Sequence, residues 1–133
     1  MDADAQSAMS VVMDASAVLA ILFGERGADV AAASARGARL STVNLTEILE
    51  KIARRTGTCD AVLPTLAELK IDIVPFDQHQ ARLAADLKPR VGKNDSFADR
   101  ACLSLALASA LPVVSADRAW ADLDIGVDIR MIR

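Results

Sequence analysis

The feature that most constrains this chain is the alternation of short apolar, β-branched runs with segments of helical periodicity. The predicted strands are Ser10–Met13, Leu40–Ser41, Ile71–Val74, Val113–Ser115 and Val127–Met131. Helical segments are predicted over residues 18–23, 28–35, 45–55, 61–69, 77–87 and 98–111, with a short turn of helix over 118–123. Strands that alternate with helices predict an α/β fold, with a mostly parallel central sheet and helices on both faces.

The length of 133 residues fits one domain. We expect a single domain over residues 10–133, preceded by a flexible acidic and polar tail over residues 1–9. The hydrophobic fraction of 53% is high for a domain of this size and predicts an apolar patch that a partner or a second copy covers. No apolar run approaches the ~20 residues of a membrane helix. The first ten residues do not resemble a signal peptide, so we expect a cytoplasmic protein without membrane contact.

Several kinds of catalytic site are disfavoured by the residues that the chain lacks. Cys59 and Cys102 have no CxxC partner, and His79 is the only histidine, so zinc binding is not expected. We expect buried thiols and a structural or surface histidine. Metal-free ribonucleases usually need imidazoles as acid and base, and serine or cysteine hydrolases need a base beside the nucleophile. Phosphate-binding loops of the GxxxxGK[ST] and GxGxxG types are absent from the sequence.

Four carboxylates lie either just after a predicted strand or in a helix next to one in the sequence. Asp14 directly follows the first strand, Asp117 lies two residues past the fourth, Glu47 lies in the helix after the second, and Asp99 lies in the first turn of the helix before the fourth. Each of them alone could be a helix cap or a surface charge. In a parallel sheet, however, these positions meet at the carboxyl edge of the strands.

Carboxylates that converge at one edge would repel each other and raise one another's pKa values. A hard divalent cation removes this repulsion, and Mg²⁺ and Mn²⁺ prefer oxygen ligands. Such ions can activate a water and stabilise the leaving oxygen of a displacement at phosphorus. The pattern therefore predicts a metal-dependent phosphodiesterase. Phosphatases with an aspartate nucleophile usually show DxD after the first strand, whereas this chain has Asp14-Ala15-Ser16.

Three segments, VVMDASAVLAIL, STVNLTEILEKI and SFADRACLSLALASALPVVSADRAW, resemble PIN-domain ribonucleases, above all the VapC-type toxins of toxin–antitoxin pairs. The resemblance spans about residues 11–132 and implies a PIN-like three-layer sandwich. It implies that Asp14 and Asp99 are the central metal ligands, that Glu47 and Asp117 complete the acidic set, and that Ser115 lies beside the metal.

The resemblance also implies an activity and partners. Relatives are Mg²⁺- or Mn²⁺-dependent endoribonucleases that often cleave tRNA and leave a 5′-phosphate. They commonly form homodimers and bind an antitoxin, which can give a toxin–antitoxin hetero-oligomer. Two alternatives stay open: a non-catalytic PIN-like module that binds protein or RNA, and another Mg²⁺-dependent phosphohydrolase. The RNA, the antitoxin and the choice between one and two metals are not predicted.

Residues around the acidic set receive further interpretations. Asp95 either joins the metal site or caps the next helix together with Ser96, and we favour the cap. A basic group after Glu47 either binds RNA phosphates or forms a solvated helix face. Its members are Lys51, Arg54 and Arg55. Because aromatic residues make up only 3% of the chain, we expect core positions for Trp120, Phe97 and Phe76 rather than a base-stacking platform.

Overall fold

The computed structural model describes residues 10–133, so the predicted tail over residues 1–9 lies outside the described residues. Helices and strands alternate along the chain as the periodicity predicts. In chain order they are β1 (Val12–Met13), α2 (Ala15–Phe23), α3 (Ala28–Ala33), β2 (Arg39–Ser41), α4 (Thr42–Thr56), α5 (Val62–Glu68), β3 (Asp72–Val74), α6 (Gln78–Leu87), the 3₁₀ turn η1 (Lys88–Arg90), α7 (Phe97–Ser109), β4 (Val113–Ser115), the 3₁₀ turn η2 (Arg118–Trp120) and β5 (Ile129–Met131).

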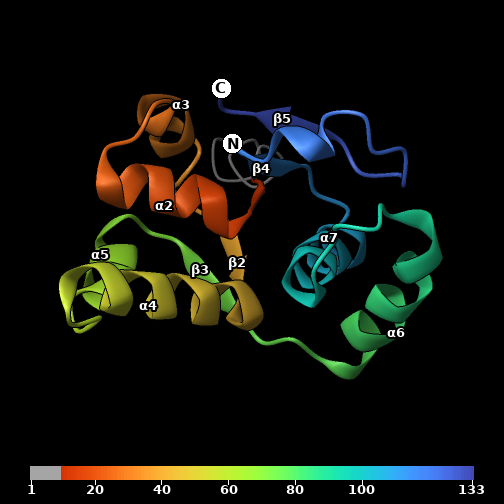
Figure 1. Ribbon diagram of the computed structural model, residues 1–133, viewed down its shortest axis with the longest axis horizontal. Helices are drawn as coiled ribbons and strands as arrows, with labels where there is room; N and C mark the ends of the chain where they lie inside the picture. The colour runs from red at the N-terminus through yellow and green to blue at the C-terminus, as the bar shows by residue number, and fades with distance from the viewer. Residues whose placement is uncertain (1–9) are drawn as a thin grey trace, which may run out of the picture.

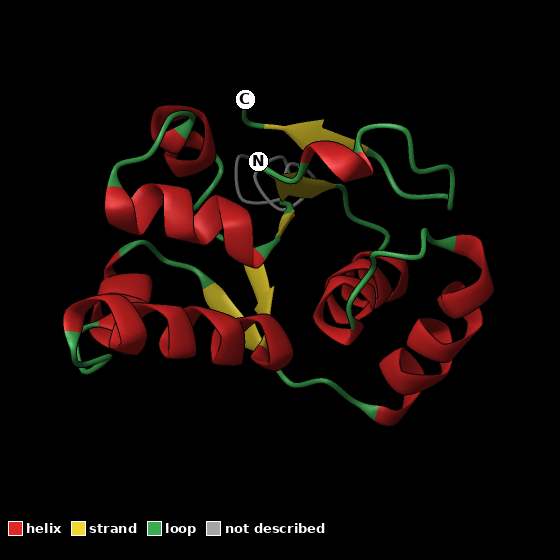
Figure 2. Cartoon of the chain, in the orientation of Figure 1, coloured by secondary structure: helices red, strands yellow, loops and turns green. Residues whose placement is uncertain are grey.

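The five strands form one sheet in the order β3-β2-β1-β4-β5, and every neighbouring pair is parallel. Helices α2 to α5 lie on one side of the sheet, and α6 and α7 lie on the other (Figure 1). Colouring by secondary structure shows the strands enclosed between these two helical layers (Figure 2). The predicted three-layer α/β fold is therefore confirmed.

Two hydrophobic clusters, one on each side of the sheet, hold the layers together. Met13 packs into the cluster with Leu40 and Ile48, whereas its neighbour Val12 packs into the other cluster with Leu103 and Val113. Successive side chains of a strand point to opposite faces. Because both faces are covered, the central strand β1 is apolar at both positions, and β4 is apolar up to its last residue, Ser115, instead of alternating with polar residues.

The starts of α4 and α7 are fixed by serine N-caps. Helix α4 begins three residues earlier than predicted because Ser41, the last residue of β2, is its N-cap and accepts a hydrogen bond from the Val43 amide. Helix α7 begins after Ser96, which forms a capping box with Asp99. Because α4 follows β2 and α7 leads back to the start of the parallel strand β4, both helices begin at the carboxyl edge of the sheet.

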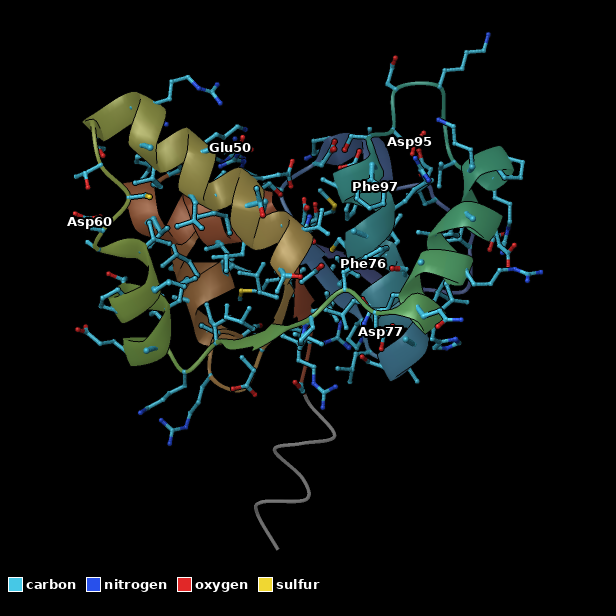
Figure 3. All side chains as sticks on the ribbon, turned by 90° about the horizontal axis from the view of Figure 1, so that it is seen from below. Glu50, Asp60, Phe76, Asp77, Asp95 and Phe97 are labelled. Atoms are coloured by element: carbon cyan, nitrogen blue, oxygen red, sulfur yellow. The ribbon has the colours of Figure 1, made fainter. Side chains whose placement is uncertain are left out.

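The surface differs from the sequence expectation at the aromatic residues. Trp120 is buried as predicted, but Phe97 is 50% exposed and packs edge-on against half-buried Phe76 with ring centroids 5.4 Å apart (Figure 3). The core prediction is therefore wrong for Phe97, because its place at the first turn of α7 points it away from the sheet.

The other large, well-exposed apolar side chains among residues 10–133 are Val30 and Leu63, on two further helices. A contiguous apolar patch stays a prediction.

The remaining sequence expectations concern the thiols, the histidine and the membrane. Cys102 is buried and Cys59 is half-buried, and both are free thiols. His79 is exposed on α6. Among the described residues, no helix has the length and apolar character that crossing a membrane requires.

Candidate active site

A cavity of about 310 Å³ opens at the carboxyl edge of the sheet, and all four predicted carboxylates line it. They come from separate parts of the chain: the end of β1, helix α4, helix α7 and the segment after β4. The lining residues are Asp14, Ala15, Ser16, Leu19, Glu47, Lys51, Asp99, Ala116, Asp117 and Arg133. The parallel topology thus brings together side chains that are far apart in the sequence, such as Asp14 and Asp117.

Asp14 is the most buried of the four acids, with 5% of its surface exposed. Its position is fixed because its amide donates to the Val114 carbonyl, which continues the pairing of β1 with β4. Its Oδ2 accepts hydrogen bonds from Ser16 Oγ at 2.6 Å and Ser115 Oγ at 3.0 Å. Burial raises the pKa of Asp14 from 3.8 to about 6, although both hydroxyls lower it and the nearby charges of Asp99 and Glu47 raise it further.

Glu47 is held by Asn44, which lies one turn earlier on α4. The fully buried Asn44 amide donates from Nδ2 to Glu47 Oε1 at 3.1 Å and to the Ala98 carbonyl at 3.0 Å. This side chain therefore joins α4 to α7, the two helices that carry Glu47 and Asp99. Burial raises the pKa of Glu47, Asn44 lowers it, the charge of Asp99 raises it and Lys51 lowers it.

Asp99 and Asp117 are both caps and cavity residues. Asp99 accepts from the Ser96 amide at 3.0 Å, and Asp117 accepts from the Ala119 amide at 3.0 Å. Burial raises the pKa of Asp99, its bonds to Ser96 lower it, and the charge of Asp117 raises it. The cap interpretations of these two acids are thus correct for their local bonds, and the same side chains also border the cavity.

Whether the cavity suits a metal ion depends on which ligand atoms line it and where they lie. Among residues 10–133, no three acidic, histidine or cysteine side chains form a closed set of ligands as they stand. The acids accept hydrogen bonds from donors within three residues along the chain, except that Asp14 also accepts from Ser115 on β4. The donors that line the cavity are carboxylate oxygens, with raised pKa values at Asp14, Glu47 and Asp99. Oxygen donors of excess negative charge fit a hard divalent cation.

Asn44→Ala is expected to lower the free energy of unfolding by about 2–3 kcal/mol, because it removes a fully buried amide that donates both to the Glu47 carboxylate and to the Ala98 carbonyl on α7. Urea denaturation measures the change. The exposed loop residue Asn94 provides the matched control, and Asn94→Ala should change the stability by less than about 0.5 kcal/mol. A similarly small effect of Asn44→Ala would contradict this role.

Asp95 does not line this cavity. Ser96 alone is the N-cap of α7, and Asp95 lies on the preceding loop (Figure 3), where its carboxylate is 2.7 Å from Arg100 Nε and 3.5 Å from Lys88 Nζ. The favoured cap prediction for Asp95 is therefore wrong. With 8% of its side chain exposed, the carboxylate instead anchors the loop to α7 through an ion pair.

The basic group on α4 divides in two. Lys51 lines the cavity, whereas Arg54 and Arg55 do not. Arg54 is exposed, and Arg55 stacks on Phe23 with 3.8 Å between the guanidinium carbon and the ring centroid.

Three residues near the site are not among the predicted site residues. They are Ser16, Asn44 and Arg133. Ser16 and Asn44 stand out in the sequence only as potential caps, but Arg133 lies two residues past the last strand, the same signal that identifies Asp117 past β4.

Comparison with known proteins places this geometry in a family. The family model described as "PIN domain" matches residues 11–126. The chain belongs to the PIN-domain family. No curated protein matches the chain. The PIN-domain match covers the segments that contain all four cavity carboxylates.

Solved structures share this PIN fold over nearly the whole chain. A toxin–antitoxin complex from Klebsiella pneumoniae is 16% identical with a TM-score of 0.76, covering 92% of this chain and 98% of that one. VapBC-5 from Mycobacterium tuberculosis is 25% identical with a TM-score of 0.64, covering 94% and 98%. VapC20 from Mycobacterium tuberculosis, a sarcin-ricin loop cleaving toxin, is 19% identical with a TM-score of 0.66, covering 89% and 98%. The resemblance to VapC-type PIN domains is confirmed.

Proposed function

We propose that this protein is a metal-dependent endoribonuclease, the toxin of a toxin–antitoxin pair, which hydrolyses phosphodiesters of tRNA or another structured RNA. The observation that carries the proposal is the convergence of four carboxylates from four parts of a PIN domain on one cavity. A domain that only bound a partner would gain nothing from carboxylates that raise one another's pKa values.

In this proposal Asp14, Glu47, Asp99 and Asp117 hold Mg²⁺ or Mn²⁺. When bound, such an ion supplies activation of water and neutralisation of charge at phosphorus. The chain's own groups keep the acids in place: Ser16 and Ser115 orient the Asp14 carboxylate, and Asn44 orients Glu47. The Ser115 hydroxyl also accepts from the Asp117 amide at 2.9 Å, so one side chain aligns two acids.

Lys51 supplies a positive charge inside the acidic cavity, four residues after Glu47 and therefore on the same face of α4. We assign it to a phosphate of the substrate, a contact that positions RNA without reading its sequence. Arg54, exposed one turn further along, is assigned to the same backbone at greater distance. An antitoxin and a second copy of the chain are the proposed protein partners, and the cytoplasm is the proposed location.

Removing the metal is expected to abolish activity. The purified protein should cleave total tRNA in millimolar Mn²⁺ or Mg²⁺ and should lose all cleavage in excess EDTA, because the acids alone repel the phosphodiester. Cleavage should return when Mn²⁺ is added above the EDTA concentration. Cleavage that persists in EDTA would contradict the proposed metal dependence. Absence of cleavage with either ion would favour a non-catalytic PIN-like module.

A further inference from the structure

Two arginines share one carboxylate at the border of the acidic cavity. Arg133 lines the cavity, and its Nη1 donates to the Arg26 carbonyl at 2.8 Å and lies 3.7 Å from Glu25 Oε1. Arg55 Nη1 lies 3.9 Å from the other oxygen of the same carboxylate, Glu25 Oε2. We call Arg55, Glu25 and Arg133 the arginine cluster. It joins the end of β5, the loop after α2 and helix α4.

The fold fixes the position of this cluster. The Ile132 amide donates to the Ser115 carbonyl at 3.0 Å, which extends the pairing of β5 with β4 and carries Arg133 to the same sheet edge as the acids. The Arg133 carbonyl in turn accepts from Arg118 Nη1 at 3.1 Å. On α4, Arg55 lies eight residues after Glu47, so the two side chains are about two turns apart along the helix and about 80° apart around it.

The cluster has unused hydrogen-bond donors and excess positive charge. Two guanidinium groups face one carboxylate, and Lys51 adds a third cation in the adjoining cavity. The side chains of Arg133 and Arg55 are 31% and 58% exposed. A guanidinium has five N–H donors, of which the structure uses few, and its fork matches two oxygens of a phosphate.

We propose that the arginine cluster binds a backbone phosphate of the RNA other than the one being cleaved, a proposal that rests on the proposed ribonuclease function. Glu25 is a positioning residue in this scheme. An arginine that turned onto Asp14 or Glu47 would neutralise the acids and displace a cation, and the contacts of Arg133 with Glu25 and with the Arg26 carbonyl hold it away from them. The RNA strand then runs from the carboxylates along α4 toward the cluster.

Steady-state cleavage of fluorescently labelled tRNA in Mn²⁺ tests this proposal. Arg133→Gln and Arg55→Gln should each raise KM about 10-fold with kcat within about twofold, which corresponds to about 1.4 kcal/mol of binding. Each should also reduce the salt dependence of log kcat/KM by about 0.7. The matched control is Arg130→Gln on β5, which loses an exposed arginine paired with Asp128 at 3.2 Å outside the cavity.

Arg133→Gln that behaves like Arg130→Gln, or that lowers kcat at unchanged KM, would overturn the proposal. Arg133→Lys keeps the charge but loses the fork, so its KM should lie between that of the natural protein and that of Arg133→Gln. If Arg133→Gln and Arg133→Lys are impaired equally, the positive charge contributes nothing to binding and the proposal fails. These outcomes are distinct from a failure of the proposed function, in which the natural protein itself cleaves no RNA with Mn²⁺.

Discussion

Asp14→Asn is expected to reduce RNA cleavage by a factor of about 100 to 1,000 or more, because a neutral amide replaces the most buried carboxylate of the cavity. The fold should persist, since the amide keeps the size of the side chain and one oxygen that can accept from Ser16 or Ser115. Initial rates on tRNA in saturating Mn²⁺ measure the loss, and circular dichroism checks the fold.

Asp122→Asn is the matched control for this experiment. Asp122 is exposed and does not line the cavity, so its substitution removes the same charge without touching the site. Its rate should stay within about twofold of the natural protein. Substantial cleavage by a folded Asp14→Asn protein would remove Asp14 from the catalytic set.

Asp14→Asn is also expected to stabilise the metal-free protein, by about 2 kcal/mol at pH 7.5 and by almost nothing at pH 4. The folded-state pKa of Asp14 is about 6, against an ordinary aspartate value of 3.8. Folding therefore disfavours the charged form, and the natural protein loses stability as the pH rises from about 4 through about 6. Two pKa units correspond to about 3 kcal/mol, and the amide recovers less because it has one acceptor oxygen.

Thermal unfolding in EDTA at both pH values measures this effect, which at pH 7.5 corresponds to roughly 5–10 °C in Tm. Saturating Mn²⁺ should reverse the order, because it binds the folded natural protein and raises its Tm but leaves Asp14→Asn unchanged. A natural protein more stable than Asp14→Asn in EDTA at pH 7.5 would show that burial does not destabilise the charged form of this carboxylate.

Much of the fold could be predicted because local signals agree with the global arrangement. The apolar runs around Met13 and Val114 lie between helical layers on both faces, and α2 ends at Gly24, which adopts the left-handed conformation common at helix ends. The parallel topology then follows from the alternation of strands and helices. It is this topology that places Asp14 and Asp117 at one edge and makes a shared site predictable from scattered residues.

Other parts of the site could not be predicted because caps and sites use the same residue types. Ser16 and Asn44 are polar residues near helix starts, and spacing alone does not show that they orient Asp14 and Glu47 across the cavity. The same ambiguity explains Asp95, whose ion pair with Arg100 depends on the path of a loop. The core prediction fails at Phe97 because its hydrophobicity does not reveal which way the first turn of α7 faces.

The central claim is that carboxylates from four parts of the chain form one cation site, and anomalous scattering from crystals soaked in Mn²⁺ tests it most directly. We expect an anomalous peak inside the cavity, within coordination distance of the Asp14 and Asp99 carboxylates and absent from Asp14→Asn crystals. A cavity that stays without a peak at millimolar Mn²⁺, or a peak only at carboxylates elsewhere on the surface, would contradict the account.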